Sequence, residues 1–171
     1  MAEPFKNLLN KKVIETMALN FQKQWPDFDH YNFLSAATDR LETLELKQRT
    51  DRITNTMAQF FPADYEKAAE LMLNSLGPPL ADDISVNSTH TDGITGWAIM
   101  PLANYVGMYG HGHFDLSMTL FKAMTKRASA EFGIRFFIQA SPYKTLAQLK
   151  IWTRDECLHV RRLVSEATRP R

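Results

Sequence analysis

The sequence has 171 residues, enough for one domain with a substantial buried core, and its hydrophobic fraction of 44% is ordinary for a globular protein. A single cysteine, Cys157, excludes an intrachain disulfide framework, and no stretch approaches the roughly 20 apolar residues that span a bilayer. The amino terminus lacks the apolar core of a secretory signal, so we expect a cytoplasmic protein that does not bind membranes.

The net charge of +1 conceals a division between two parts of the chain. Residues 122–171 hold eleven basic and four acidic residues, a net charge of +7, and residues 1–121 hold nine basic and fifteen acidic residues, a net charge of −6. Such a division indicates that one end faces a polyanion, but a solvated basic helix face has the same pattern. Charge alone leaves both interpretations open.

Apolar residues recur with helical spacing through the first 76 residues and predict four helices joined by short connections. Pro26 ends the first, Asp29 caps the second, Pro62 follows the third, and Gly77 stops the fourth. The predicted buried stripes are Ile14, Met17, Ala18, Phe21 and Trp25; Phe33, Ala37, Leu41 and Leu44; Leu46, Ile53, Met57 and Phe60; and Ala68, Leu71, Met72 and Leu76.

Residues 77–96 are rich in Gly, Pro, Ser, Thr and Asp, which predicts a loop. Helical spacing then returns, with Asp115 and Asp155 as predicted caps of two later helices. We leave the short apolar segment GIRFFIQA, residues 133–140, without a helix. The later stripes are Trp97, Leu102, Tyr105, Val106 and Tyr109; Leu116, Leu120, Phe121 and Met124; Leu146, Leu149 and Trp152; and Val160, Leu163 and Val164.

The absence of convincing two-residue alternation predicts an all-α chain, and a short sequence echo refines this. RASAE at 127–131 matches RLVSE at 162–166 in its Arg and Glu, 35 residues apart. A period of this order is typical of stacked helical hairpins of the HEAT, armadillo or TPR kind. We therefore predict an α-α superhelix, an α-solenoid, in which Glu131 and Glu166 are neighbours on adjacent helices.

Two neighbouring carboxylates within a basic surface suggest a chemical role. The simpler explanation is that each Glu pairs with the Arg four residues before it, a contact that contributes about 0.3–0.5 kcal/mol. On the last predicted helix, however, His159, Arg162, Glu166 and Arg169 fall on one face. Cations there would hold phosphates, and the carboxylate would stabilise the oxocarbenium-like transition state of glycosidic-bond cleavage.

Other candidate sites are weaker. His111 and His113 in the GHGH segment, with His90 before them, have no fixed spacing that brings further metal ligands, so we predict no metal site. The acidic neighbours of Cys157 make it a poor nucleophile. We expect Trp97 and Trp152 to lie in the core.

Four segments together extend from Ala2 to Arg171: AEPFKNLLN, FPADYEKAAELMLNSLGPPL, HFDLSMTLFKAMTKRASAEFGIRFFI and TLAQLKIWTRDECLHVRRLVSEATRPR. They resemble the bacterial DNA alkylation repair glycosylases of the AlkC type. The most specific parts are SAEF…R and HVRRLVSEATRPR. The resemblance implies HEAT-like helical hairpin repeats, similar in architecture to the AlkD glycosylases, with a concave basic face that holds duplex DNA.

The resemblance also implies a function: hydrolysis of the N-glycosidic bond of cationic alkylated bases such as 3-methyladenine, without turning the nucleotide into a deep pocket. Glu131 and Glu166 match the active-site glutamates by motif, and no metal or organic cofactor is implied. We expect a monomeric bacterial protein, nucleoid-associated when it acts on double-stranded DNA. The predicted DNA contacts are Arg127, Arg135, His159, Arg162, Arg169 and Arg171.

In the family the final motif continues into an aromatic residue and a catalytic Asp in the next repeat. We therefore expect residues 1–171 to form one HEAT-like domain that is incomplete at its carboxy terminus relative to the family. Two alternatives stay open beside the glycosylase: a catalytically impaired or non-catalytic platform that binds duplex DNA, and a helical scaffold for protein partners.

Overall fold

The computed structural model describes residues 4–80 and 92–170, and within these ranges the chain is built from helices with no strand. A single parallel bridge joins Leu76 to Ile94. The α-helices are α1 (Lys11–Gln24), α2 (His30–Thr38), α3 (Leu46–Phe60), α4 (Tyr65–Ser75), α5 (Ile99–Tyr109), α6 (Phe114–Thr125), α7 (Glu131–Ala140), α8 (Pro142–Trp152) and α9 (Leu158–Thr168). Shorter 3-10 helices are η1 (Phe5–Leu9), η2 (Leu41–Thr43), η3 (Gly96–Ala98) and η4 (His111–His113).

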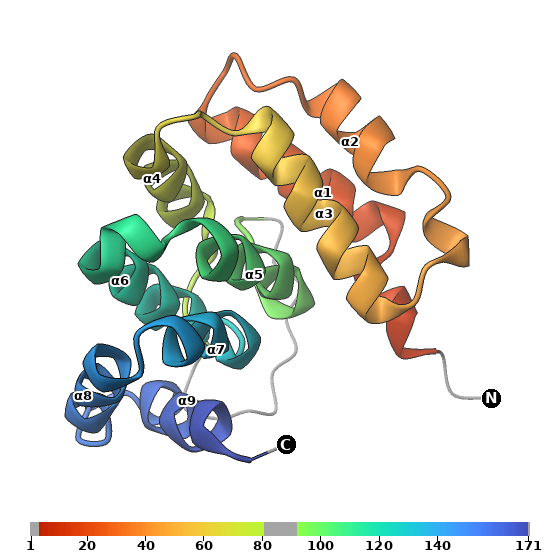
Figure 1. The fold of residues 1–171 in the computed structure, drawn as a ribbon. Coiled ribbons are helices and arrows are strands. Elements are labelled where there is room, and N and C mark those ends of the chain that lie inside the picture. The colour runs from red at the N-terminus through yellow and green to blue at the C-terminus, as the bar shows by residue number, and fades with distance from the viewer. Residues whose placement is uncertain (1–3, 81–91, 171) are drawn as a thin grey trace.

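The helices are arranged in two layers, as Figure 1 shows. In one layer α3 packs on α5, α5 on α7, and α7 on α9. In the other layer α1 packs on α4 and α4 on α6, while α8 packs against α7 and α9. This stacking of successive helical hairpins confirms the predicted all-α helical repeat fold.

Local sequence signals fix most helix ends. The side chain of Asn10 accepts a hydrogen bond from the Val13 N–H at the start of α1, and Asp29 caps α2 as predicted, through the Asn32 N–H. Glu45 and Gln48 form a reciprocal capping box at the start of α3. One residue separates each of α1, α3 and α4 from Pro26, Pro62 and Gly77 respectively, so these helices end where the sequence predicts.

Four sequence expectations are wrong in detail. The segment 133–140 belongs to helix α7, and α2 ends at Thr38, so that Leu41 lies in η2 instead of on a longer α2. Asp115 lies inside the first turn of α6, and Asp155 precedes α9 by three residues. Asp155 accepts a hydrogen bond from the Cys157 N–H and thus closes a turn rather than capping the helix.

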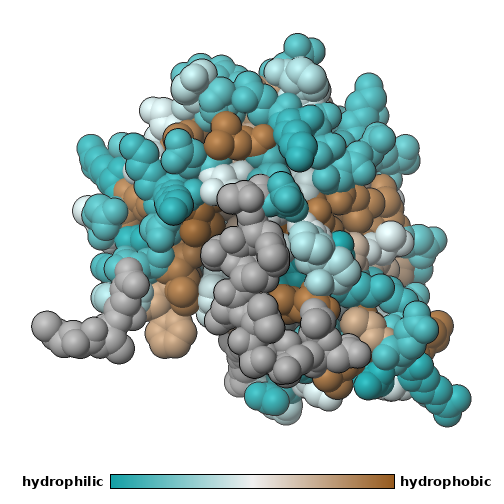
Figure 2. Space-filling view, turned by 180° about the vertical axis from the view of Figure 1, so that it is seen from behind, coloured by the Kyte–Doolittle hydropathy of each residue, from teal (hydrophilic) through white to brown (hydrophobic). Residues whose placement is uncertain are grey.

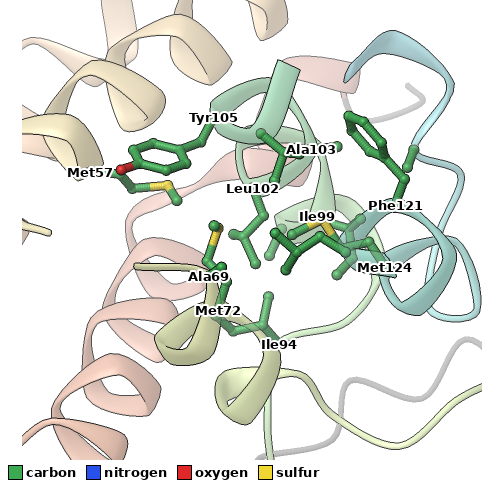
Figure 3. Close-up of a cluster of buried hydrophobic side chains, with 14 of the residues drawn as sticks. Met57, Ala69, Met72, Ile94, Ile99, Leu102, Ala103, Tyr105, Phe121 and Met124 are labelled. Carbon is green, nitrogen blue, oxygen red and sulfur yellow. The ribbon is translucent and has the colours of Figure 1, made fainter. Parts of the chain in front are cut away.

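The core runs continuously between the two layers. Figure 3 shows Ile99 and Leu102 of α5 close to Met72 of α4 and Met124 of α6. Ile94, which follows the long connection, packs in the same cluster and is 2% exposed. Since α5 is buried from Pro101 to Gly107, it is the central helix on which α3 and α7 are placed.

Candidate functional site

The two predicted glutamates lie where the start of α7 meets the end of α9. Glu131 is the first residue of α7, and Glu166 is two residues before the end of α9. Ser129, which precedes α7, hydrogen-bonds Glu166, and this contact fixes the two helix ends beside each other. Figure 1 shows α9 running back along α7 toward the carboxy terminus. The glutamates are therefore brought together from different ends of their helices.

Glu166 has both carboxylate oxygens engaged. Its Oε2 accepts a hydrogen bond of 2.5 Å from Ser129 Oγ, and its Oε1 accepts one of 2.6 Å from Arg162 Nε. The Glu166 side chain is 18% exposed, whereas that of Arg162 is 47% exposed. The carboxylate is thus half-buried, with a neutral donor on its protein side and a cation on its solvent side.

Arg135 connects Glu131 to the end of α9. Its Nη2 lies 3.6 Å from Glu131 Oε2 and donates a hydrogen bond of 2.6 Å to the main-chain oxygen of Glu166. The same nitrogen lies 3.4 Å from the main-chain oxygen of Arg169. A guanidinium at the carboxyl end of a helix satisfies carbonyls that have no partner within the helix. Arg135 therefore acts as a clamp between the two helices.

The pairing that the echo suggested holds for only one glutamate. Arg162 and Glu166 form the expected pair within α9. Arg127 instead lies outside α7 and donates hydrogen bonds to the main-chain oxygens of Gly77 and Ala123. Burial lowers the pKa of the Arg127 guanidinium. The two echo segments thus stand at different positions relative to their helices, although their glutamates are neighbours.

The predicted DNA contacts fall into different environments. Arg162 and Arg169 are exposed at the end of the α7–α9 layer, as a phosphate contact requires. His159, predicted on the same surface strip, is only 6% exposed because α9 turns this side chain into the core. Its expected surface position is wrong. Arg171 lies outside the described residues.

The positive charge of residues 122–171 is spread over both layers. Lys122 of α6 forms an ion pair of 2.5 Å with Asp155, and Lys144 of α8 lies over the ring of Phe114. Lys150 of α8 is exposed. Figure 2 shows hydrophilic side chains interspersed with apolar patches on the described part of the face opposite to that of Figure 1. The cations beside the glutamates are therefore only part of the basic surface.

Sequence reasoning missed Ser129 as a partner of Glu166. The only signal was its position two residues before a candidate glutamate, which does not predict a contact 37 residues away. Trp97 was also misplaced: it is 43% exposed and packs edge-on against Phe5, whereas Trp152 is buried as predicted.

The two histidines of the GHGH segment each stack on a different aromatic ring of the fold. His111 stacks on Phe137 and His113 stacks on Tyr65. Within the part of the chain that the structure describes, no three His, Cys, Asp or Glu side chains gather as a metal ion would require. His90 lies outside that part.

Two surface hollows lie away from the glutamates. One of about 640 Å³ lies between α2 and α3, and one of about 420 Å³ lies between the end of α1 and α4. Neither hollow is lined by Glu131, Glu166 or the arginines that contact them. The side chains of Glu131 and Glu166, each 18% exposed, therefore lie outside both hollows.

The chain is similar to a solved DNA-repair enzyme over its whole length. The Pseudomonas fluorescens alkylpurine DNA glycosylase AlkC, bound to DNA containing an abasic site analog, matches with a TM-score of 0.84 and 30% sequence identity, covering 100% of this chain and 44% of that one. The uncharacterized protein YhaZ of Bacillus subtilis (strain 168) is 30% identical over 169 residues, 97% of this chain and 43% of YhaZ. No family model matches the sequence.

These similarities confirm the resemblance to the AlkC type and its all-α repeat fold. The chain spans less than half of the length of either relative. Among residues 4–80 and 92–170, no helix is long and apolar enough to cross a membrane.

Proposed function

From this similarity to AlkC in both sequence and fold, we propose that the chain binds duplex DNA and takes part in the repair of alkylation damage. The finer proposal is that it is a DNA glycosylase that hydrolyses the N-glycosidic bond of cationic alkylated bases such as 3-methyladenine. The observation that carries it is the half-buried pair of Glu131 and Glu166 at the junction of α7 and α9, each beside an arginine.

The chemistry suits a pair of carboxylates. An alkylated cationic purine is already a good leaving group, because breaking its bond to C1′ sends the bonding electrons onto the base and neutralises it. The sugar becomes oxocarbenium-like, and nearby negative charge stabilises this state. Water then bonds to C1′ and loses a proton, leaving an abasic site. We assign Glu131 and Glu166 to the stabilisation of the cationic sugar and base and to the placement of the water.

The surroundings supply the binding energy. Arg162 and Arg169 are exposed beside the glutamates, and we assign them to contacts with phosphates next to the lesion. Phosphate contacts of this kind fix the register of a protein on DNA without reading its sequence. The positive charge on the outer helices adds long-range attraction to the duplex.

A second candidate is a non-catalytic platform that binds duplex DNA. It is favoured by one observation: both carboxylate oxygens of Glu166 already accept hydrogen bonds within the protein. Such a platform needs no free carboxylate.

One experiment distinguishes the two candidates. Duplex DNA treated with a methylating agent is incubated with the protein, and free base is measured by chromatography while binding is measured on the same duplex. A glycosylase releases 3-methyladenine above the spontaneous rate. Binding that weakens steeply with salt, with no base released, would favour the platform and contradict the enzymatic proposal.

A further inference from the structure

Glu166 is held by two donors of different chemical kinds, and we propose that they behave differently when DNA binds. Ser129 is a positioning residue that keeps the Glu166 carboxylate oriented, and Arg162 is an exchangeable counter-ion that leaves Glu166 for a DNA phosphate. The inference rests on the proposed function, because it takes a cationic base in duplex DNA as the ligand.

The contact with Ser129 is built to persist. The hydroxyl donates to Glu166 Oε2 at 2.5 Å from a half-buried position between α6 and α7. The segment that carries it is held by a main-chain hydrogen bond from Ala128 to Met124. A neutral hydroxyl also gains little by moving to a phosphate, whereas a cation gains more. Ser129 therefore keeps its place while DNA binds.

The contact with Arg162 is built to exchange. The pair with Glu166 spans four residues on one helix, and the Arg162 side chain is 47% exposed while that of Glu166 is 18% exposed. Pairs of this class contribute little to stability, so breaking them is easy. A phosphate offers the guanidinium an equally charged and more accessible partner.

In the free protein the guanidinium occupies the place beside Glu166 Oε1 that a cationic base or sugar would take. The proposed substrate carries a new partner for each residue: a phosphate anion for Arg162 and a cationic base for Glu166. On binding, the two ion pairs exchange partners: Arg162 pairs with the phosphate, and Glu166 pairs with the lesion. Undamaged DNA supplies the phosphate alone and leaves Glu166 without a cation, so the exchange favours alkylated nucleotides.

Arg135 shows the contrasting arrangement. Its side chain is 21% exposed, and it is held by the main-chain oxygens of Glu166 and Arg169 as well as by Glu131. A guanidinium with several intramolecular acceptors loses them all if it moves. Arg135 therefore stays as a clamp, and Arg162 is the arginine that exchanges.

A double-mutant cycle tests the exchange without requiring base release. Affinity for a duplex containing an abasic-site analog is measured for wild type, Arg162→Gln, Glu166→Gln and the double variant. Removing the Glu166 carboxylate frees Arg162 for the phosphate. Glu166→Gln should therefore raise the affinity for DNA more in the wild-type protein than in the Arg162→Gln variant, and we expect these two effects to differ by roughly twofold or more. Arg161 provides the matched control, because it is an exposed neighbour whose guanidinium donates to main-chain oxygens of Asp155 and Glu156 instead of to a carboxylate.

The Nε–H resonance of Arg162, observed by ¹⁵N NMR, gives a direct readout. We expect it to shift when a duplex containing a positively charged abasic-site analog is added, because that duplex supplies both the phosphate and the cation, and we expect the resonance of Arg135 to shift less. Additive effects of Arg162→Gln and Glu166→Gln, together with an Arg162 resonance that does not move, would overturn the exchange. Because neither readout uses catalysis, a wild-type protein that releases no base would contradict the proposed function and leave this test intact.

Ser129 is tested through the rate. Ser129→Ala should lower the single-turnover rate of base release while the affinity for the abasic-site duplex is retained, and Ser129→Thr should restore the rate. A Ser129→Ala rate equal to that of wild type would overturn the positioning role.

Discussion

Gly133 of α7 lies directly against Ala103 of α5. A β-carbon at position 133 would overlap the main-chain oxygen of Ala103 and lie 2.8 Å from Cε1 of Phe121. Gly107 of α5 faces Gly133 in turn, so that the two helices approach through their backbones. Since Glu131 is two residues before Gly133, this contact also fixes the position of the Glu131 carboxylate relative to α5.

The first prediction concerns that contact. Gly133→Ala forces α7 away from α5 and should lower the free energy of unfolding by about 1–3 kcal/mol. Urea denaturation followed by circular dichroism measures this. Gly112→Ala is the matched control, because nothing lies within 4 Å of the added carbon. Equal stability of the two variants would contradict the close packing of α5 and α7.

A second prediction concerns pH. Burial alone raises the pKa of the Asp155 carboxyl, but hydrogen bonds from Lys122 and from the Cys157 N–H outweigh it and hold the pKa below its ordinary value. Because the pKa is lower in the folded than in the unfolded chain, the resulting stability is present above the unfolded pKa of about 3.9 and is lost as the pH falls through the folded value.

Asp155→Asn should therefore destabilise the protein at pH 7, and its difference from wild type should shrink as the pH falls below about 4. Unfolding free energies measured across this range test the expectation. Asp115→Asn is the control, since the Asp115 side chain is 95% exposed and lies 3.9 Å from Lys144. A constant difference between Asp155→Asn and wild type at every pH would contradict the assignment.

The third prediction concerns Arg49, which is fully buried in α3. Its guanidinium donates to the main-chain oxygens of Leu44, Lys6 and Leu9, and so attaches η1 to the fold. Arg49→Met leaves these oxygens without a donor and should lower the free energy of unfolding by about 3 kcal/mol.

Faster proteolysis near η1 should accompany that loss in stability. Arg52→Met is the comparison, because the Arg52 side chain is 35% exposed and lies 3.5 Å from Asp39. Its cost should be about 1 kcal/mol or less. Similar losses in the free energy of unfolding for Arg49→Met and Arg52→Met would contradict the stabilising role of the buried Arg49 guanidinium.

A fourth prediction concerns DNA binding. Arg169 is exposed beside the glutamates, so Arg169→Gln should weaken binding to any duplex and reduce the slope of log affinity against log salt by about 1. Lys23→Gln, an exposed cation at the end of α1, should leave the slope nearly unchanged. DNA-binding titrations at several salt concentrations measure this slope. Equal slopes for Arg169→Gln and Lys23→Gln would show that the DNA does not contact Arg169.

The sequence allowed most helices to be predicted, because proline and glycine stop them and their buried residues recur every three or four positions. Helix α7 escaped notice for a physical reason. It is a short run that carries the half-exposed Phe132 and Phe136 beside the buried Ile134 and Phe137, and periodicity alone does not distinguish such a short apolar run from a strand. Its contact with α5 depends on Gly133, a residue that sequence reasoning does not favour within a helix.

The neighbourhood of Glu131 and Glu166 was predictable from the echo and the family resemblance, but its construction was not. The clamp by Arg135 and the hydrogen bond from Ser129 both join α7 to the end of α9 across more than 30 residues. The burial of His159 likewise depends on how α9 packs. Such contacts are set by tertiary packing, on which local patterns carry no information.

The role of the two glutamates is tested most directly by the single-turnover release of 3-methyladenine from methylated duplex DNA. Wild type is compared with Glu131→Gln, Glu166→Gln and the double variant, and Glu15→Gln, an exposed carboxylate on α1, serves as the control. We predict that the double variant loses about 10²-fold or more of the rate and that Glu15→Gln keeps it. Equal release by wild type and the double variant would contradict the central claim that these carboxylates carry the reaction.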